Sequence, residues 1–87
     1  MSNNATTAIT ITVLYFASLA EQAGKDEEIL TIANGDLGAI YADLSAKYGF
    51  DLNQDKLAVA INHQMTHWQA AVHDGDVLAF IPPVAGG

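Results

Sequence analysis

The alternation of hydrophobic and polar positions predicts a chain made mostly of short strands. Apolar side chains and threonines alternate from Ile9 to Val13, which is typical of a strand with one buried face. From Leu14 onward both faces become apolar, so we expect the second face of this strand to be covered or to bind something. Five strands are expected in all, over residues 9–16, 27–32, 56–62, 65–68 and 77–81.

Two helices are expected between these strands. Large apolar side chains at helical spacing predict a main helix over residues 37–48. Asp36 can cap its N-terminus with a side-chain oxygen, and Gly49 can end it in the left-handed conformation. A shorter helix over residues 17–23 would end at Gly24 in the same way. The apolar stripe of the main helix consists of Leu37, Ile40, Tyr41, Leu44 and Tyr48.

The first and last strands are the most apolar, so we expect them to lie adjacent and parallel in the middle of the sheet. A mixed sheet of this kind, packed on one main helix that follows a first hairpin, is the β-grasp (ubiquitin-like) arrangement, an α+β fold. The length of 87 residues suits one domain. We place a flexible extension at residues 1–8, the β-grasp domain at residues 9–81 and an extended tail at residues 82–87.

Charge and composition exclude several classes of function. The net charge is −7, from ten acidic residues against three lysines and no arginine, so we expect neither nucleic acid nor a membrane surface as a partner. A protein with a basic patch would be attracted instead. The absence of cysteine excludes disulfides, thiolate zinc sites and cysteine nucleophiles, and it favours the cytoplasm. No positive charge precedes the apolar stretch over residues 9–20, so a strand explains it better than a signal peptide.

Candidate catalytic and metal-binding side chains are few. His63 and His67 are four residues apart, but in a predicted turn and strand this spacing does not bring two ligands together. We expect surface histidines, His73 included, and no metal site. Asp74 and Asp76 flank a glycine and suit a tight turn better than calcium binding or acid–base chemistry.

The acidic run Asp26-Glu27-Glu28 has two interpretations. The first is a solvated start of a strand, and the alternative is an electrostatic contribution to docking. Nucleotide-binding glycine motifs, catalytic triads and Cys–His pairs do not occur in the sequence. We therefore expect no stably bound cofactor, and the tail is the remaining candidate for chemistry.

The last eight residues read FIPPVAGG. Pro82 and Pro83 favour an extended polyproline form that carries the chain away from the sheet. Six residues at about 3.3 Å each span roughly 20 Å, enough to reach another protein's active site. Gly86 and Gly87 have no side chain and fit a narrow channel. Adenylation with ATP would activate the Gly87 carboxylate for attack by an amine, giving a conjugate, or by a sulfur donor, giving a thiocarboxylate.

At two places the chain resembles a known family. The segment DGDVLAFIPPVAGG, residues 74–87, closely resembles the end of the small sulfur-carrier subunit of molybdopterin synthase. The segment VLYFASLAEQAG, residues 13–24, resembles that family's first strand and short helix. Element order and length match over residues 9–87, although the middle of the chain is not specific.

The resemblance implies a ubiquitin-like sulfur carrier without catalytic side chains of its own. An E1-like enzyme would adenylate Gly87 with ATP, and a sulfurtransferase system would convert it to a thiocarboxylate. The tail would enter the large subunit of molybdopterin synthase, in a heterotetramer. There its sulfur would pass to cyclic pyranopterin monophosphate to build the molybdopterin dithiolene of the molybdenum cofactor. The tail residues that would enter the partner are Pro82, Pro83, Val84, Ala85 and Gly86.

A docking surface follows from strand parity. If Val13, Tyr15, Leu78 and Phe80 face the helix, the alternate residues of the same strands point outward. An exposed apolar patch of this kind usually marks a partner surface, unless a loop covers it. The residues that we expect to contact the large subunit are Leu14, Phe16 and Ile81, with Met65 beside them.

The chain departs from the family pattern at two places. Ala20 stands where relatives often carry an arginine, which puts any ion pair of that arginine in doubt, and residues 1–8 extend beyond the usual start.

Three alternative functions remain open. They are a thiamine-type sulfur carrier, a ubiquitin-like protein modifier joined to lysines through Gly87, and a β-grasp interaction module with an inert tail. Deleting Gly87 would leave only the last of these functional.

Overall fold

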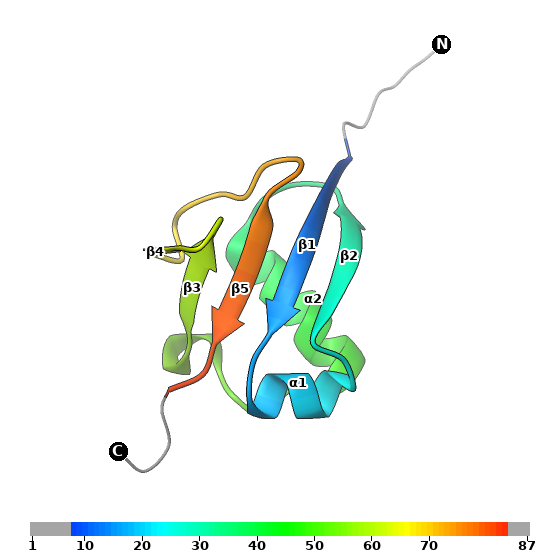
Figure 1. The fold of residues 1–87 in the computed structure, drawn as a ribbon, viewed down its shortest axis with the longest axis vertical. Coiled ribbons are helices and arrows are strands. Elements are labelled where there is room, and N and C mark those ends of the chain that lie inside the picture. Colours follow the sequence, from blue (N-terminus) through cyan, green and yellow to red (C-terminus); the bar gives the residue numbers. More distant parts are fainter. Residues whose placement is uncertain (1–7, 84–87) are drawn as a thin grey trace.

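A five-stranded mixed sheet forms one layer of the molecule, and helix α2 covers one of its faces (Figure 1). The computed structural model describes residues 8–83. The strands lie in the order β2-β1-β5-β3-β4, with β1 and β5 parallel and the other neighbours antiparallel. The predicted pairing of the first and last strands is therefore confirmed. The strands are β1 (Ile9–Tyr15), β2 (Glu27–Ile32), β3 (Ala58–Ile61), β4 (Gln64–Thr66) and β5 (Val77–Ile81).

The main helix α2 (Leu37–Tyr48) has the predicted bounds, because both of its ends are set by local chemistry. Asp36 Oδ1 accepts the N–H groups of Gly38 and Ala39 at 3.0 and 3.3 Å. Gly49 ends the helix at φ 72°. Helix α1 (Ser18–Ala23) ends at Gly24 in the same left-handed conformation, also as predicted.

Aromatic side chains make up much of the core between the sheet and α2. The chain has one tryptophan, three tyrosines and three phenylalanines, and six of these seven rings form one connected cluster. Phe80 is completely buried, with its ring 5.2 Å from Tyr41 and 5.8 Å from Trp68, measured between centroids. Phe16 is the ring that belongs to none of these pairs.

The turn between Val72 and β5 ties together the ends of three strands. The Thr10 N–H donates to Asp74 Oδ1 at 2.7 Å, and the Gly75 N–H donates to the Thr10 carbonyl at 2.8 Å. Asp76 accepts Asn62 Nδ2–H at 2.9 Å, and this hydrogen bond, followed by the backbone N–H of His73, lowers the pKa of Asp76. The predicted turn-forming role of the two aspartates is confirmed.

Three predicted strands are shorter in the structure, and the first of them ends at Tyr15, one residue earlier than predicted. A 3₁₀ helix, η1 (Gln54–Lys56), precedes β3, so this strand starts two residues later than predicted. The fourth strand was expected to include Trp68, which is wrong. The Trp68 ring turns into the core against Phe80, and its Nε1–H donates to the Leu57 carbonyl at 3.2 Å, so tertiary packing ends β4 at Thr66.

Candidate functional site

The parallel ends of β1 and β5 bring three of the candidate docking residues, Leu14, Phe16 and Ile81, to the end of the sheet where α1 lies and where the chain leaves β5 (Figure 1). In register, Tyr15 lies opposite Phe80, and both are buried against α2. The next residues in the chain, Phe16 and Ile81, therefore point away from the core. Phe16 is 44% exposed and Ile81 is half-buried, so the predicted parity is confirmed at this end. Their docking role stays a prediction.

Ala17 turns the chain sharply between β1 and α1. Its backbone has φ 53° and ψ −125°, a conformation that glycine adopts freely and other residues adopt at a cost. The Leu19 N–H then donates to the Phe16 carbonyl at 3.1 Å, and the Glu21 N–H donates to the Ala17 carbonyl at 3.2 Å. The turn sends Leu19 into the core and leaves the Phe16 ring on the surface.

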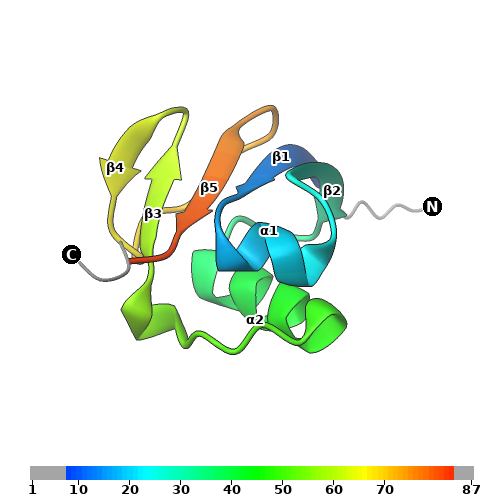
Figure 2. The same ribbon diagram turned by 60° about the horizontal axis from the view of Figure 1, so that its bottom comes forward.

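A mainly apolar hollow of about 680 Å³ lies where the chain leaves the sheet, and we call it the tail-base hollow. Its lining includes Phe16 and Leu52 together with Ile81, Pro82 and Pro83. Figure 2 shows how α1 and the end of β5 come together at this end of the molecule. The first two residues of the proposed tail therefore share a surface with Phe16.

A second hollow of about 300 Å³ also adjoins Phe16, and we call it the acidic-rim hollow. Leu14, Ala17 and Ala20 line it together with Asp26 and Glu27. The Tyr15 N–H donates to the Asp26 carbonyl at 2.8 Å, which fixes the loop before β2 against the end of β1. Phe16 and Ala17 line both hollows.

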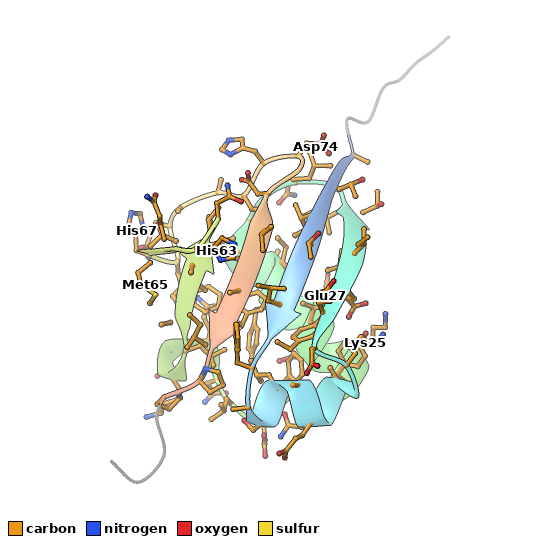
Figure 3. The ribbon with its side chains drawn as sticks, viewed as in Figure 1. Lys25, Glu27, His63, Met65, His67 and Asp74 are labelled. Carbon is orange, nitrogen blue, oxygen red and sulfur yellow. The ribbon has the colours of Figure 1, made fainter. Side chains whose placement is uncertain are left out.

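Met65 lies on edge strand β4 (Figure 3), away from the other docking residues at β1 and β5. The register runs from Leu14 to Ala79, then to Ala60 and to Met65. Two strands therefore separate Met65 from Leu14, a distance of about 14 Å at the usual strand spacing. The expectation of an adjacent position is wrong, although Met65 is 64% exposed.

The interpretation of the acidic run Asp26-Glu27-Glu28 as a solvated segment is wrong for Glu28. Its side chain turns inward and is 12% exposed, whereas Asp26 and Glu27 are exposed. The hydroxyls of Tyr15 and Tyr48 donate to Glu28 Oε1 at 2.7 and 2.5 Å. The alternation along β2, which places Glu28 on the same face as Leu30 and Ile32, was the signal for this position.

Two lysines complete the surroundings of Glu28. Lys25 Nζ and Lys47 Nζ lie 3.9 and 3.8 Å from Glu28 Oε2. Burial alone would raise the pKa of Glu28, but the hydrogen bonds from Tyr48 and Tyr15 and the charges of the two lysines outweigh it and lower the pKa. The pKa of Tyr15 is raised, first by burial and then by its hydrogen bond to the carboxylate. The network links β1, β2 and α2 behind the candidate site.

The remaining candidates form no site within residues 8–83. His63, His67 and His73 are exposed, and no group of three possible metal ligands occurs in this range. None of the helices described for this range is long and apolar enough to cross a membrane. Val84, Ala85, Gly86 and Gly87, the tail residues predicted to carry the chemistry, lie outside the described residues.

The chain is similar to known proteins over most of its length. The family model described as the ThiS family matches residues 13–87. A curated relative from Haemophilus influenzae, named molybdopterin synthase sulfur carrier subunit, is 36% identical over 80 residues, which covers 88% of this chain and 99% of that protein.

Two solved structures have the same fold. One is a complex of subunits 1 and 2 of the molybdopterin-converting factor from Helicobacter pylori, and a chain of it matches with 25% identity and a TM-score of 0.64 over 91% of this chain and 100% of that chain. The other is SAMP1 from Haloferax volcanii, with 26% identity and a TM-score of 0.72 over 90% of this chain and 99% of that chain.

Proposed function

Because the chain belongs to the ThiS family, we propose that it is the sulfur-carrier subunit of a molybdopterin synthase. The observation that carries the proposal is the tail-base hollow, in which an exposed aromatic ring and the two prolines before the Gly-Gly sequence share one apolar surface. A partner that covers this surface takes up the start of the tail at the same time. Docking and delivery of the tail are then a single event.

The chemistry proposed for the tail needs no side chain of this protein. The Gly87 carboxylate attacks the α-phosphorus of ATP on an E1-like enzyme, and pyrophosphate leaves. A persulfide sulfur from a sulfurtransferase system then displaces AMP, and reduction of the resulting acyl disulfide by a thiol leaves the terminal thiocarboxylate. In the large subunit this sulfur bonds to a side-chain carbon of the cyclic pyranopterin precursor, and the oxygen on that carbon leaves as its carbon–oxygen bond breaks. Water then cleaves the resulting thioester, which leaves the sulfur on the precursor and regenerates the Gly87 carboxylate. Two such deliveries supply the two sulfurs of one dithiolene.

The proposed docking surface consists of Leu14, Phe16 and Ile81, with Met65 as a separate outer contact. The Helicobacter pylori structure supports a subunit partner of this kind, since it is a complex of subunit 1 with subunit 2 of the molybdopterin-converting factor. The activating enzyme and the sulfurtransferase system are further proposed partners. We place the protein in the cytoplasm, because the proposed activation consumes ATP.

Reconstitution tests the proposal directly. The protein would be activated with ATP and a sulfur source on the E1-like enzyme of the same organism, and intact-mass analysis should show a gain of about 16 mass units as sulfur replaces oxygen. The thiocarboxylated protein, mixed with the large subunit and the pterin precursor, should yield the dithiolene. The Gly87-deleted protein is the control and should show neither result. Absence of dithiolene with a competent large subunit would refute the proposal.

A protein modifier is the second candidate. It is favoured by the similarity to SAMP1, the small archaeal modifier protein 1, whose TM-score of 0.72 is higher than the 0.64 of the complex subunit. A modifier would form amide bonds between Gly87 and lysines of other proteins, so conjugates of higher mass would accumulate in cells. The same mass analysis therefore distinguishes the two functions.

A further inference from the structure

The acidic-rim hollow has an apolar floor and two carboxylates at its edge. Leu14, Ala17 and Ala20 line the floor, and the small size of the two alanines leaves the space of about 300 Å³ open. Glu27 lies opposite Leu14 in the pairing of β1 with β2, so its side chain belongs to the same open face. Asp26 immediately precedes it and also lines the hollow.

These two carboxylates have no internal counter-charge within residues 8–83. The nearby lysines, Lys25 and Lys47, both form ion pairs with Glu28 on the other face of the sheet. Each also lies over the ring of Tyr48, with Nζ 5.5 and 5.1 Å from the ring centroid. Asp26 and Glu27 form no ion pair in the described part of the chain, and the protein has only one further lysine, Lys56, on η1.

We propose that the acidic-rim hollow receives one basic side chain, an arginine or a lysine, from the protein that accepts the tail. A long side chain of this type has an apolar stem and a charged end. The stem would lie on Leu14, Ala17 and Ala20, and the charged end would reach Asp26 and Glu27. Charge complementarity and an apolar floor therefore point to the same occupant.

The acidic-rim hollow adjoins the proposed docking surface, because Phe16 lines both this hollow and the tail-base hollow. The inference rests on the proposed function, since it places the basic residue on the large subunit that binds the tail. A protein with a net charge of −7 has negative charge on many surfaces, but here two carboxylates adjoin an apolar cavity of side-chain size. This combination makes the hollow a determinant of partner specificity.

Binding of the large subunit from the same organism, measured by isothermal titration calorimetry at low and high salt, tests the inference. Glu27→Lys should weaken binding about tenfold or more at low salt, and the effect should shrink at high salt because the charges are then screened. Asp43→Lys is the matched control, since Asp43 is an exposed acid on α2, and it should change the affinity less than about twofold. Ala20→Leu fills the hollow without altering charge and should also weaken binding, whereas Ala42→Leu on exposed α2 should not.

The outcomes separate failure of this inference from failure of the proposed function. Equal losses for Glu27→Lys and Asp43→Lys, or no loss for Glu27→Lys, would overturn the inference while a loss for Phe16→Asp still supported the docking surface. A loss with Ala20→Leu alone would indicate an apolar occupant and would also overturn it. If the unaltered protein did not bind the large subunit, the proposed function would fall, and the inference with it.

Discussion

Replacing Phe16 by aspartate should disrupt docking without unfolding the protein. Phe16 is 44% exposed, and a phenylalanine side chain has about 200 Å² of surface, so docking can bury roughly 90 Å² of the ring. At about 25 cal/mol per Å², this burial contributes about 2 kcal/mol, which corresponds to roughly a thirtyfold change in affinity. The introduced carboxylate would add a desolvation cost, so the loss should be at least this large.

Calorimetric titration into the large subunit measures the affinity, and urea unfolding followed by circular dichroism measures stability. The ring belongs to none of the aromatic pairs of the core, so the fold should survive the change. Ile29→Asp is the matched control, because Ile29 is 70% exposed on edge strand β2 and lines neither hollow. An unchanged affinity for Phe16→Asp, or an equal loss for both variants, would refute the assignment of the docking surface.

Two further predictions concern stability. Ala17→Gly should raise the free energy of unfolding by about 1 kcal/mol, because relief of the strain at φ 53° outweighs the added chain entropy; a lower urea midpoint would contradict this. The pKa of Glu28 is lowered in the folded state, so its network stabilises the protein above the unfolded glutamate pKa of about 4.3, and this stabilisation is lost as pH falls through the lower folded pKa. Urea unfolding at a series of pH values should show this loss of stability on the acid side. The Glu28→Gln variant should be less stable at neutral pH and should lose less stability on acidification. If the stability of the variant and of the unaltered protein changed with pH in parallel, the role of the network would be refuted.

The features that the sequence predicted well are those set by neighbouring residues. Asp36 and Gly49 fix the two ends of α2 through contacts within a few positions of the helix, so local rules were sufficient. The inward and outward sides of β1 and β5 followed from a period of two, since each strand has one face packed on α2. Phe16 and Ile81 could thus be placed on the surface before any coordinates were known.

The features that escaped prediction depend on residues far apart in the chain. Trp68 leaves the fourth strand because its ring packs on Phe80, which lies beyond a separate turn. Glu28 is held by Tyr15 and Tyr48, from a different strand and from α2. Ala17 adopts a backbone conformation that its residue type disfavours, so no local rule indicates it. Ala17 lines both hollows beside Phe16, and they could not be predicted from the sequence either.

The placement of the lysines connects these structural observations with the proposed function. Lys25 and Lys47 both neutralise Glu28, so two of the three positive charges of the chain stabilise the fold on the helix side of the sheet. Asp26 and Glu27, which line the acidic-rim hollow, form no ion pair among the described residues. Docking would therefore bring an uncompensated negative surface to a basic partner and, through the parallel pairing of β1 with β5, deliver the start of the tail at the same place. Because Lys25 and Lys47 are engaged with Glu28, the negative charges of Asp26 and Glu27 stay available for the proposed partner.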